Sequence, residues 1–358
     1  MHPNKKKILF RLDAGSIFGM GHLSRCVTLA NSFGCEYNIT FWVKTDSQQK
    51  VESFLEKRLN SNDDIRFDFF EPEIPKKKDV EAIISYCAGN DVFLILDHYS
   101  LDDNYQKTIA DAGIRFLLFD SHGISNLYAD AILHASPSAT HEVYKPLLKN
   151  PNALLLLGTS YAIMDYGFAK AREGLQVRTS LKNILICMGG GNDKGASLKI
   201  LQFLETFPLN DMTVEVIVGE NHPDFETVRK LCFSIEQFIH IPGTKNMPEH
   251  MRQADLGIIA SGTLSYEAAC MGMPMLLCVI ADNQNMNAEG WDKLDCAINM
   301  GKIEKLQQED LTSYLKLLLD NTTKLQEMSE KGMRAVDGLG VFRVKEQIDQ
   351  LIHSQFTH

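Results

Sequence analysis

Two stretches of the sequence repeat one pattern, in which a lysine-led apolar run leads into a glycine-rich loop and then into a helix. The first reads KKILFRLDAGSIFGMGH (6–22) and the second reads KNILICMGGGNDKGAS (182–197). Glycines let the backbone turn sharply and approach a ligand closely, and the free amides at a helix start attract phosphate groups. In doubly wound α/β sheets, ligands bind at such loops. The repeat therefore predicts two Rossmann-like domains in tandem.

The remaining apolar runs support an α/β fold class with two doubly wound domains. They are apolar on both faces and separated by helical periodicity, which is typical of parallel strands covered on both sides. The predicted strands are Ile8–Arg11, Ile39–Val43, Val92–Leu96, Phe116–Phe119, Leu154–Leu157, Ile184–Met188, Val214–Val218, Leu256–Ile259 and Met275–Val279. We expect domains at 1–165 and 178–338, and a last helical segment at 339–358 that is able to pack back on the N-terminal domain.

Composition excludes several classes of protein. The 358-residue chain has a formal net charge of −10, which argues against nucleic acid as a partner, because nucleic-acid binders need a basic surface. It has no run of apolar residues long enough for stable membrane insertion, and the N-terminal apolar run is too short for a signal peptide. The eight cysteines form no CxxC and show no metal-ligand spacing, which favours buried thiols in a cytoplasmic protein.

The first glycine-rich loop ends in Gly21-His22, at the start of a helix. The pattern is a poor match to a dinucleotide-binding loop, because Ser24 stands where a third glycine is needed. From its position, His22 is either a helix-start residue at the surface or a general base that points into the ligand site. Arg25, on the same helix, is placed to hold a substrate group or to pair with Asp13.

The second half of the chain carries its own elements for a nucleotide. Gly189-Gly190-Gly191 follows one predicted strand, and Ser261-Gly262-Thr263 follows another and starts a helix, where exposed amides and hydroxyls suit a diphosphate. Glu267 is either a ribose ligand or an acid favoured by the helix dipole. Asn283 and Gln284, in ADNQ (281–284), are either sugar or phosphate ligands or parts of a plain turn.

These motifs resemble those of the UDP-2,4-diacetamido-2,4,6-trideoxy-β-L-altropyranose hydrolases of pseudaminic acid biosynthesis. The chain is more distantly similar to the UDP-GlcNAc transferases that make lipid II. The matching segments are FRLD (10–13), GMGH (19–22), RC (25–26), DHY (97–99), LD (101–102), LG (157–158), YA (161–162), GG (189–190) with Asp193, ASGTLSYE (260–267), ADNQ (281–284) and DGLGVFRV (337–344).

The resemblance implies a GT-B fold, with two Rossmann-like domains and the active site in the cleft between them. It implies a UDP-sugar substrate, inverting attack of water at the anomeric carbon and departure of UDP, without a metal or other cofactor. It gives the general base to His22 and the ribose contact to Glu267. Asp13, Gly21, Arg25, Asp97, His98, Tyr99 and Tyr161 are the further expected substrate ligands, although Asp97 is also placed to cap the next helix.

Two positions depart from the family pattern. Asp165 stands where the family usually has an arginine, and Ser121, after Asp120, replaces the second of two aspartates. Both departures leave the sugar specificity open. A GT-B glycosyltransferase of surface polysaccharide assembly is therefore the second hypothesis, and a UDP-sugar-binding protein without catalysis is the third. The sequence does not indicate an oligomeric state.

Overall fold

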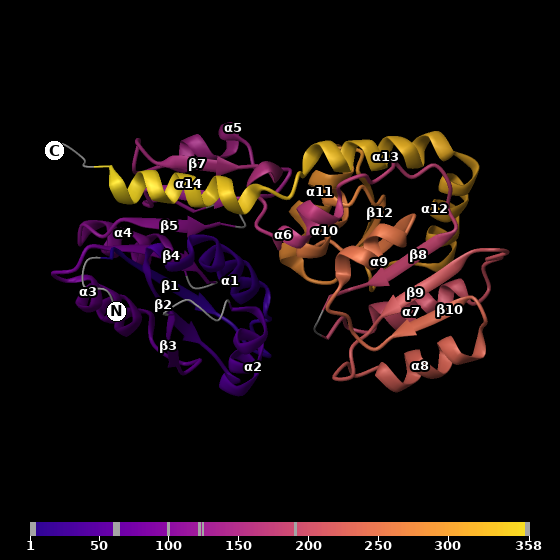
Figure 1. The fold of residues 1–358 in the computed structure, drawn as a ribbon, viewed down its shortest axis with the longest axis horizontal. Coiled ribbons are helices and arrows are strands. Elements are labelled where there is room, and N and C mark those ends of the chain that lie inside the picture. The colour runs from indigo at the N-terminus through magenta and orange to yellow at the C-terminus, as the bar shows by residue number, and fades with distance from the viewer. Residues whose placement is uncertain are drawn as a thin grey trace. The chain divides into compact units, whose positions relative to one another are not determined.

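The computed structural model describes residues 5–59, 65–98, 101–120, 123, 125–189 and 192–354. They fall into two compact units. The first unit is drawn from Met1–Ala135, Ala139–Ile163 and Leu339–His358, and the second from Ser136–Ser138 and Met164–Gly338. Each unit has a parallel sheet with helices packed on it (Figure 1).

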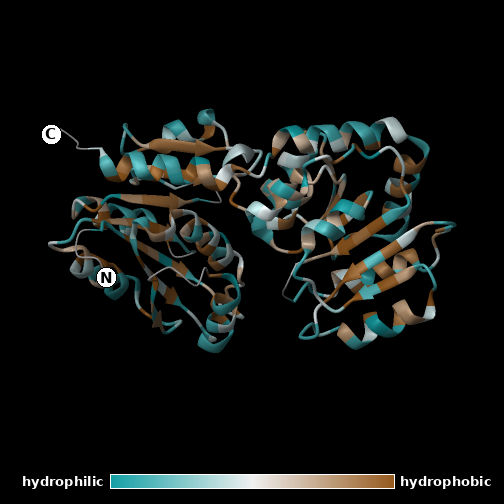
Figure 2. Cartoon of the chain, viewed as in Figure 1, coloured by the Kyte–Doolittle hydropathy of each residue, from teal (hydrophilic) through white to brown (hydrophobic). Residues whose placement is uncertain are grey.

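The first unit contains a seven-stranded parallel sheet in the order β3-β2-β1-β4-β5-β6-β7. Its strands are β1 (Lys7–Asp13), β2 (Asn38–Lys44), β3 (Ile65–Phe70), β4 (Val92–Asp97), β5 (Phe116–Phe119), β6 (Ala131–His134) and β7 (Leu154–Leu157). Every residue of β2 and of β4 is buried, as expected for strands with helices on both faces. The hydrophobic colouring of these strands marks the centre of the unit (Figure 2).

Helices from distant parts of the chain cover the two faces of this sheet. One face packs against α1 (Gly21–Phe33), α2 (Gln48–Arg58) and the C-terminal α14 (Gly340–His353). The other face packs against α3 (Lys76–Cys87), α4 (Asp103–Asp111) and the short α5 (His141–Tyr144). The C-terminal helix thus belongs to the core of the first unit.

The second unit contains a six-stranded parallel sheet in the order β10-β9-β8-β11-β12-β13. Its strands are β8 (Asn183–Cys187), β9 (Thr213–Ile217), β10 (Phe238–Ile241), β11 (Leu256–Ala260), β12 (Met275–Val279) and β13 (Ala297–Lys302). Its helices are α6 (Tyr166–Ala171), α7 (Ala196–Leu204), α8 (Phe225–Ser234), α9 (Met247–Gln253), α10 (Thr263–Cys270), α11 (Asn285–Lys293), α12 (Gln308–Asp320) and α13 (Thr322–Ala335).

Both sheets reverse their winding direction next to their first strand. In the first unit β1 lies between β2 and β4, and in the second β8 lies between β9 and β11. A doubly wound sheet binds ligands beyond the carboxyl ends of the strands at such a switch point. The structure therefore brings the loops after β1 and β4 together in the first unit, and the loops after β8 and β11 together in the second.

All nine predicted strands are present, and the structure adds β3, β6, β10 and β13. Three of these four additional strands lie at sheet edges, where one side faces solvent and polar residues interrupt the apolar run. Among the described residues, no helix combines the length and the apolar character that crossing a membrane requires. All eight cysteines are free, and only Cys35 is exposed.

Candidate active site

The first unit joins three predicted site residues around one carboxylate. Asp97, at the end of β4, is 1% exposed and lies 2.5 Å from Nδ1 of His22 through its Oδ1 atom. The guanidinium of Arg25 donates to both carboxylate oxygens, with 2.6 Å between Nε and Oδ2. Two alternatives from the sequence are thereby decided. Arg25 pairs with Asp97 and not with Asp13, and the residue that caps α4 is Asp102 and not Asp97.

These contacts fix the tautomer of His22. An ionised carboxylate only accepts hydrogen bonds, so Nδ1 carries a proton and donates it to Asp97. The Nη2 atom of Arg25 is 3.2 Å from the same nitrogen, but two donors cannot bond to each other, so that proximity follows from their shared acceptor. Nε2 of His22 then holds the lone pair that a general base needs. The side chain of His22 is 11% exposed.

The surroundings of Asp97 keep it ionised. Burial alone would raise its pKa, but the charge of Arg25 and the hydrogen bonds from Arg25 and His22 outweigh burial and hold the pKa well below its ordinary value. The Cys26 thiol also donates to Oδ2, at 3.4 Å. Burial, followed by the charge of Asp97, raises the pKa of that thiol well above its usual value, so Cys26 serves as a neutral donor.

A second buried network lies beside this carboxylate. Arg11 donates to both oxygens of Asp79 and, at 2.9 Å, to Asp13. Asp13 has no exposed surface, and Lys44 approaches its other oxygen at 3.4 Å. Asp13, the last residue of β1, is therefore held between Arg11 and Lys44.

The loop 14–20 depends on one of its glycines. Gly15 has a φ of 146°, which favours glycine, and a Cβ atom there would lie 2.0 Å from Oδ1 of Asp46 and force that side chain to move. Asp46 accepts from the amide of Ile17 at 3.3 Å. The exposed Gly21 follows this loop as the first residue of α1, directly before His22.

His98 is buried and stays neutral. Burial, with the charges of Arg11 and Lys44, holds its pKa well below the usual value, and its ring packs edge-on against Tyr105 at 5.1 Å. His98 also lines a pocket of about 60 Å³ in the first unit. The other residues that line it are His22, Arg25, Asp97, Leu101, Gln106, Leu118, Phe119, Asp120 and Ser125.

The pocket includes residues that the sequence analysis did not assign to a site. Asp120 directly follows β5, and Gln106 lies on α4. The sequence does contain a signal for Asp120: it directly follows a predicted strand, β5, which lies next to β4 in the sheet, so its side chain is expected near Asp97. Tyr161, a predicted substrate ligand, is partly buried against the apolar core beneath α14 and is not among the residues that line this pocket.

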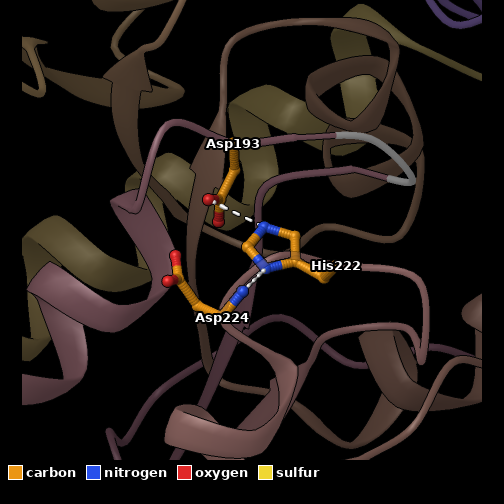
Figure 3. A group of neighbouring side chains, drawn as sticks. All are labelled: Asp193, His222 and Asp224. Carbon is orange, nitrogen blue, oxygen red and sulfur yellow. Dashed lines mark hydrogen bonds and ion pairs between the residues drawn. The ribbon is translucent and has the colours of Figure 1, made fainter.

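In the second unit, Asp193 closes the loop after β8. Its carboxylate accepts from the amides of Gly195 and Ser197 at 2.9 Å each and so caps the start of α7. Nε2 of His222 lies 2.9 Å from Oδ1 of Asp193, while Nδ1 accepts from the amide of Asp224 at 3.1 Å. Figure 3 shows the imidazole held between the two aspartates.

Asp193, His222 and Asp224 are also the one group among the described residues whose donor atoms lie close enough for a metal ion. A histidine that ligates a metal through Nε2 carries its proton on Nδ1. Here Nδ1 already accepts a hydrogen bond from a backbone amide, so the proton belongs on Nε2, facing Asp193. The hydrogen bond to Nδ1 therefore disfavours metal ligation through Nε2, and the amides of Gly195 and Ser197 already bond to the Asp193 carboxylate.

The helix α10 starts at the end of β11 without a side-chain cap. Thr263 is exposed at its first turn, where amides and the dipole attract an anion. Ser261 is buried, and its hydroxyl donates to the Gln284 carbonyl at 3.2 Å. This bond connects the loop after β11 to the turn after β12. The Oε1 atom of Gln284 accepts from the amide of Ile280 at 3.1 Å, so this side chain is also held in place.

The remaining predicted nucleotide ligands lie around the same switch point. Gly262 precedes α10, Glu267 is half-buried on that helix, and Asn283 is exposed in the turn after β12. Gly189 has a φ of 106°, and a Cβ atom there would meet nothing within 4 Å. Gly190, Gly191 and Tyr99, together with Ser121, lie outside the described residues.

Comparisons with known proteins agree with this architecture. The sequence model of the glycosyltransferase family 28 C-terminal domain matches residues 188–341. The spore coat polysaccharide biosynthesis protein SpsG of Bacillus subtilis is 26% identical over 96% of this chain and 98% of its own length. The UDP-2,4-diacetamido-2,4,6-trideoxy-β-L-altropyranose hydrolase of Campylobacter jejuni is 24% identical over 79% of this chain and 94% of its own.

Among solved structures, MurG of Acinetobacter baumannii superposes with a TM-score of 0.70 at 17% identity. The match covers 96% of this chain and 99% of that one. At this identity the likeness shows the fold alone. The chain has a GT-B fold, as its sequence resemblance implies.

Proposed function

We propose that the chain hydrolyses a UDP-linked diacetamido-trideoxy sugar to the free sugar and UDP, in nonulosonic (pseudaminic) acid biosynthesis. The observation that carries the proposal is the Asp97–His22 pair. A buried, ionised carboxylate holds Nδ1–H of His22 and leaves Nε2 as a base at the switch point of the first sheet. The Campylobacter relative, named for its hydrolysis of a UDP-diacetamido sugar, supports a substrate of this class.

In the proposed reaction, Nε2 of His22 removes a proton from a water molecule. The water oxygen forms a bond to the anomeric carbon while the bond from that carbon to the β-phosphate oxygen breaks, with inversion. Asp97 stabilises the imidazolium that forms, as the buried acid does in other carboxylate–histidine pairs. The electron pair leaves with UDP.

The second unit is the proposed nucleotide site. The uncapped start of α10 and the loop after β8 offer backbone amides and a positive dipole end to the diphosphate. In this proposal Glu267 accepts from the ribose hydroxyls, and Asn283 contacts the diphosphate or the sugar. Because amides and helix dipoles stabilise the leaving group, the proposal needs no metal.

The test is to incubate the full chain with the UDP-diacetamido sugar and to follow UDP and free sugar together. We expect turnover without an added acceptor, and a loss of at least about 100-fold in kcat for His22→Ala, with UDP affinity unchanged. His141→Ala is the matched control, because His141 is exposed on α5. No release of sugar by the wild-type chain would refute hydrolysis.

A glycosyltransferase using a UDP-sugar is the second candidate. The family 28 match over residues 188–341 favours it, and His22 would then deprotonate an acceptor hydroxyl in place of water. The two reactions differ in one observable. A transferase releases UDP at a substantial rate only when a sugar or lipid acceptor is added, whereas a hydrolase reaches its full rate in water.

A further inference from the structure

A second carboxylate, Asp120, forms part of the pocket that holds His22 and Asp97. It follows the last residue of β5, Phe119, whose ring lies 4.7 Å from the guanidinium carbon of Arg25. The proposed reaction gives Asp120 no role. Its contacts nevertheless hold it in one orientation toward the pocket.

One oxygen of Asp120 is occupied by the protein. Oδ2 accepts from the Tyr144 hydroxyl at 2.5 Å and from the Gly123 amide at 2.7 Å. Gly123 has a φ of 62°, and a Cβ atom there would lie 3.3 Å from the Val143 side chain. The close turn at this position therefore suits glycine and sets the amide toward the carboxylate.

The proton of Tyr144 points toward Asp120. Burial and then the charge of Asp120 raise the pKa of Tyr144 far above its ordinary value, so the phenol keeps its single proton. The buried His134 contacts the same hydroxyl through Nδ1 and must donate to it, because the phenolic proton is already used. His134 therefore donates to Tyr144, and Tyr144 donates to Asp120, so these hydrogen bonds hold the carboxylate in place.

The other oxygen, Oδ1, accepts no hydrogen bond from the described part of the chain. A carboxylate oxygen is an acceptor only, so a ligand there must bring an N–H or O–H group. The same pocket is lined by Leu101, Leu118 and Phe119, which suit an apolar end. A cavity of roughly 150 Å³ holds benzene, so about 60 Å³ suits a group of a few heavy atoms.

We propose that Asp120 is a specificity-determining residue that accepts a hydrogen bond from the N–H of an acylamino substituent on the sugar. The substituent's small acyl end then packs on the apolar wall. The inference rests on the proposed function only in requiring that the chain binds a UDP-sugar. Tyr144 and His134 are positioning residues, because they act on the ligand through Asp120.

The test compares two ligands that differ in this substituent alone, UDP-N-acetylglucosamine and UDP-2-deoxyglucose, because the 2-hydroxyl of UDP-glucose would itself be a donor to Asp120. Calorimetry on the full chain measures both affinities and that of UDP. We expect the wild type to prefer the acetamido ligand about tenfold, as one hydrogen bond to a charged group contributes roughly 1.5 kcal/mol or more. In Asp120→Asn the amide oxygen is held by Tyr144 and Gly123, so an NH₂ group faces the ligand and the preference should vanish.

Tyr144→Phe provides a second variant, which keeps the carboxylate but frees it to turn. We expect it to reduce the preference partly, and Tyr128→Phe, on the same side of the unit, to leave it unchanged. An equal affinity of the wild type for both ligands, or an undiminished preference in both variants, overturns the role of Asp120. Binding needs no turnover, so this result is independent of whether the chain is a hydrolase, and failure to bind UDP itself counts against the proposed function.

Discussion

At the scale of single residues, Asp97 has the greatest influence on the first unit. It receives hydrogen bonds from His22, Arg25 and Cys26 while fully buried. Its pKa in the folded chain is far below its value in the unfolded chain, which is near 3.9. Such a group stabilises the fold above the unfolded pKa, and that contribution is lost as the pH falls.

We therefore expect the free energy of unfolding to fall steeply below about pH 4, by roughly 1.4 kcal/mol per pH unit from this group. Urea unfolding between pH 3 and pH 6 measures the effect. In Asp97→Asn this part of the slope should be absent. Asp102→Asn is the control: hydrogen bonding to Lys76 lowers the pKa of that exposed carboxylate, but solvent screens the pair, and asparagine caps a helix as well as aspartate does.

The partners of these charges could not be predicted from the sequence. The sequence places Asp13, Arg25 and Asp97 at strand ends and on the first helix, and it suggests Asp13 as the acidic partner of Arg25. In the structure Arg25 pairs with Asp97 instead. Asp13 is already bonded to Arg11, which lies inside β1 and is 1% exposed. A buried arginine in a strand gives no periodic signal, so the competition for Asp13 is visible only in three dimensions.

At the scale of elements, one arginine joins the segment after α6 to the rest of the second unit. Arg178 is buried and donates to five backbone carbonyls, those of Gln176, Met251, Arg252, Ala254 and Met271. Four of these carbonyls, all except that of Gln176, lie at or near the ends of α9 and α10, where helices leave acceptors without internal partners. Arg178 therefore serves as a shared C-terminal cap.

We expect Arg178→Met to lower the free energy of unfolding by roughly 3 kcal/mol or more, because several buried carbonyls lose their donor at once. Methionine keeps most of the side-chain volume. Arg229→Met is the matched control: Arg229 is exposed on α8, pairs with Glu226 and should change stability by less than about 0.5 kcal/mol. Urea unfolding of the wild type and the two variants measures these free energies, and equal losses in the two variants would contradict the capping role of Arg178.

The predicted strands all have apolar runs, and their burial ranges from complete in β2 to partial in the edge strand β7. β1, β2 and β4 are apolar on both faces, so their sequences signal a central parallel strand. The edge strand β3, with sequence IRFDFF, alternates half-buried and exposed residues. The edge strand β10 contains only Phe238–Ile241, with a histidine inside. Short and half-polar runs of this kind are also typical of loops, which is why they were missed.

At the scale of the whole molecule, the last helix completes the core of the first unit. Val341, Val344, Ile348 and Ile352 of α14 are all buried there. The helix approaches Ala162 so closely that a Cβ atom on Gly340 would lie 2.3 Å from the Ala162 carbonyl oxygen. Asp349 accepts from the Tyr37 hydroxyl at 2.7 Å. The core of the first unit therefore needs α14 in addition to the segments from the N-terminal half of the chain.

This arrangement makes a prediction that separates the two units. Ile348→Asn replaces a fully buried side chain by an amide, and we expect a loss of roughly 2–5 kcal/mol confined to the first unit. Hydrogen exchange of the full chain should then rise in β1, β2 and β4 and remain unchanged in β8, β9 and β11. Glu346→Asn introduces the same residue on the exposed face of the same helix and should change neither sheet. If β8 lost protection as much as β1 in the Ile348 variant, α14 would stabilise the chain as a whole and the two cores would not be independent.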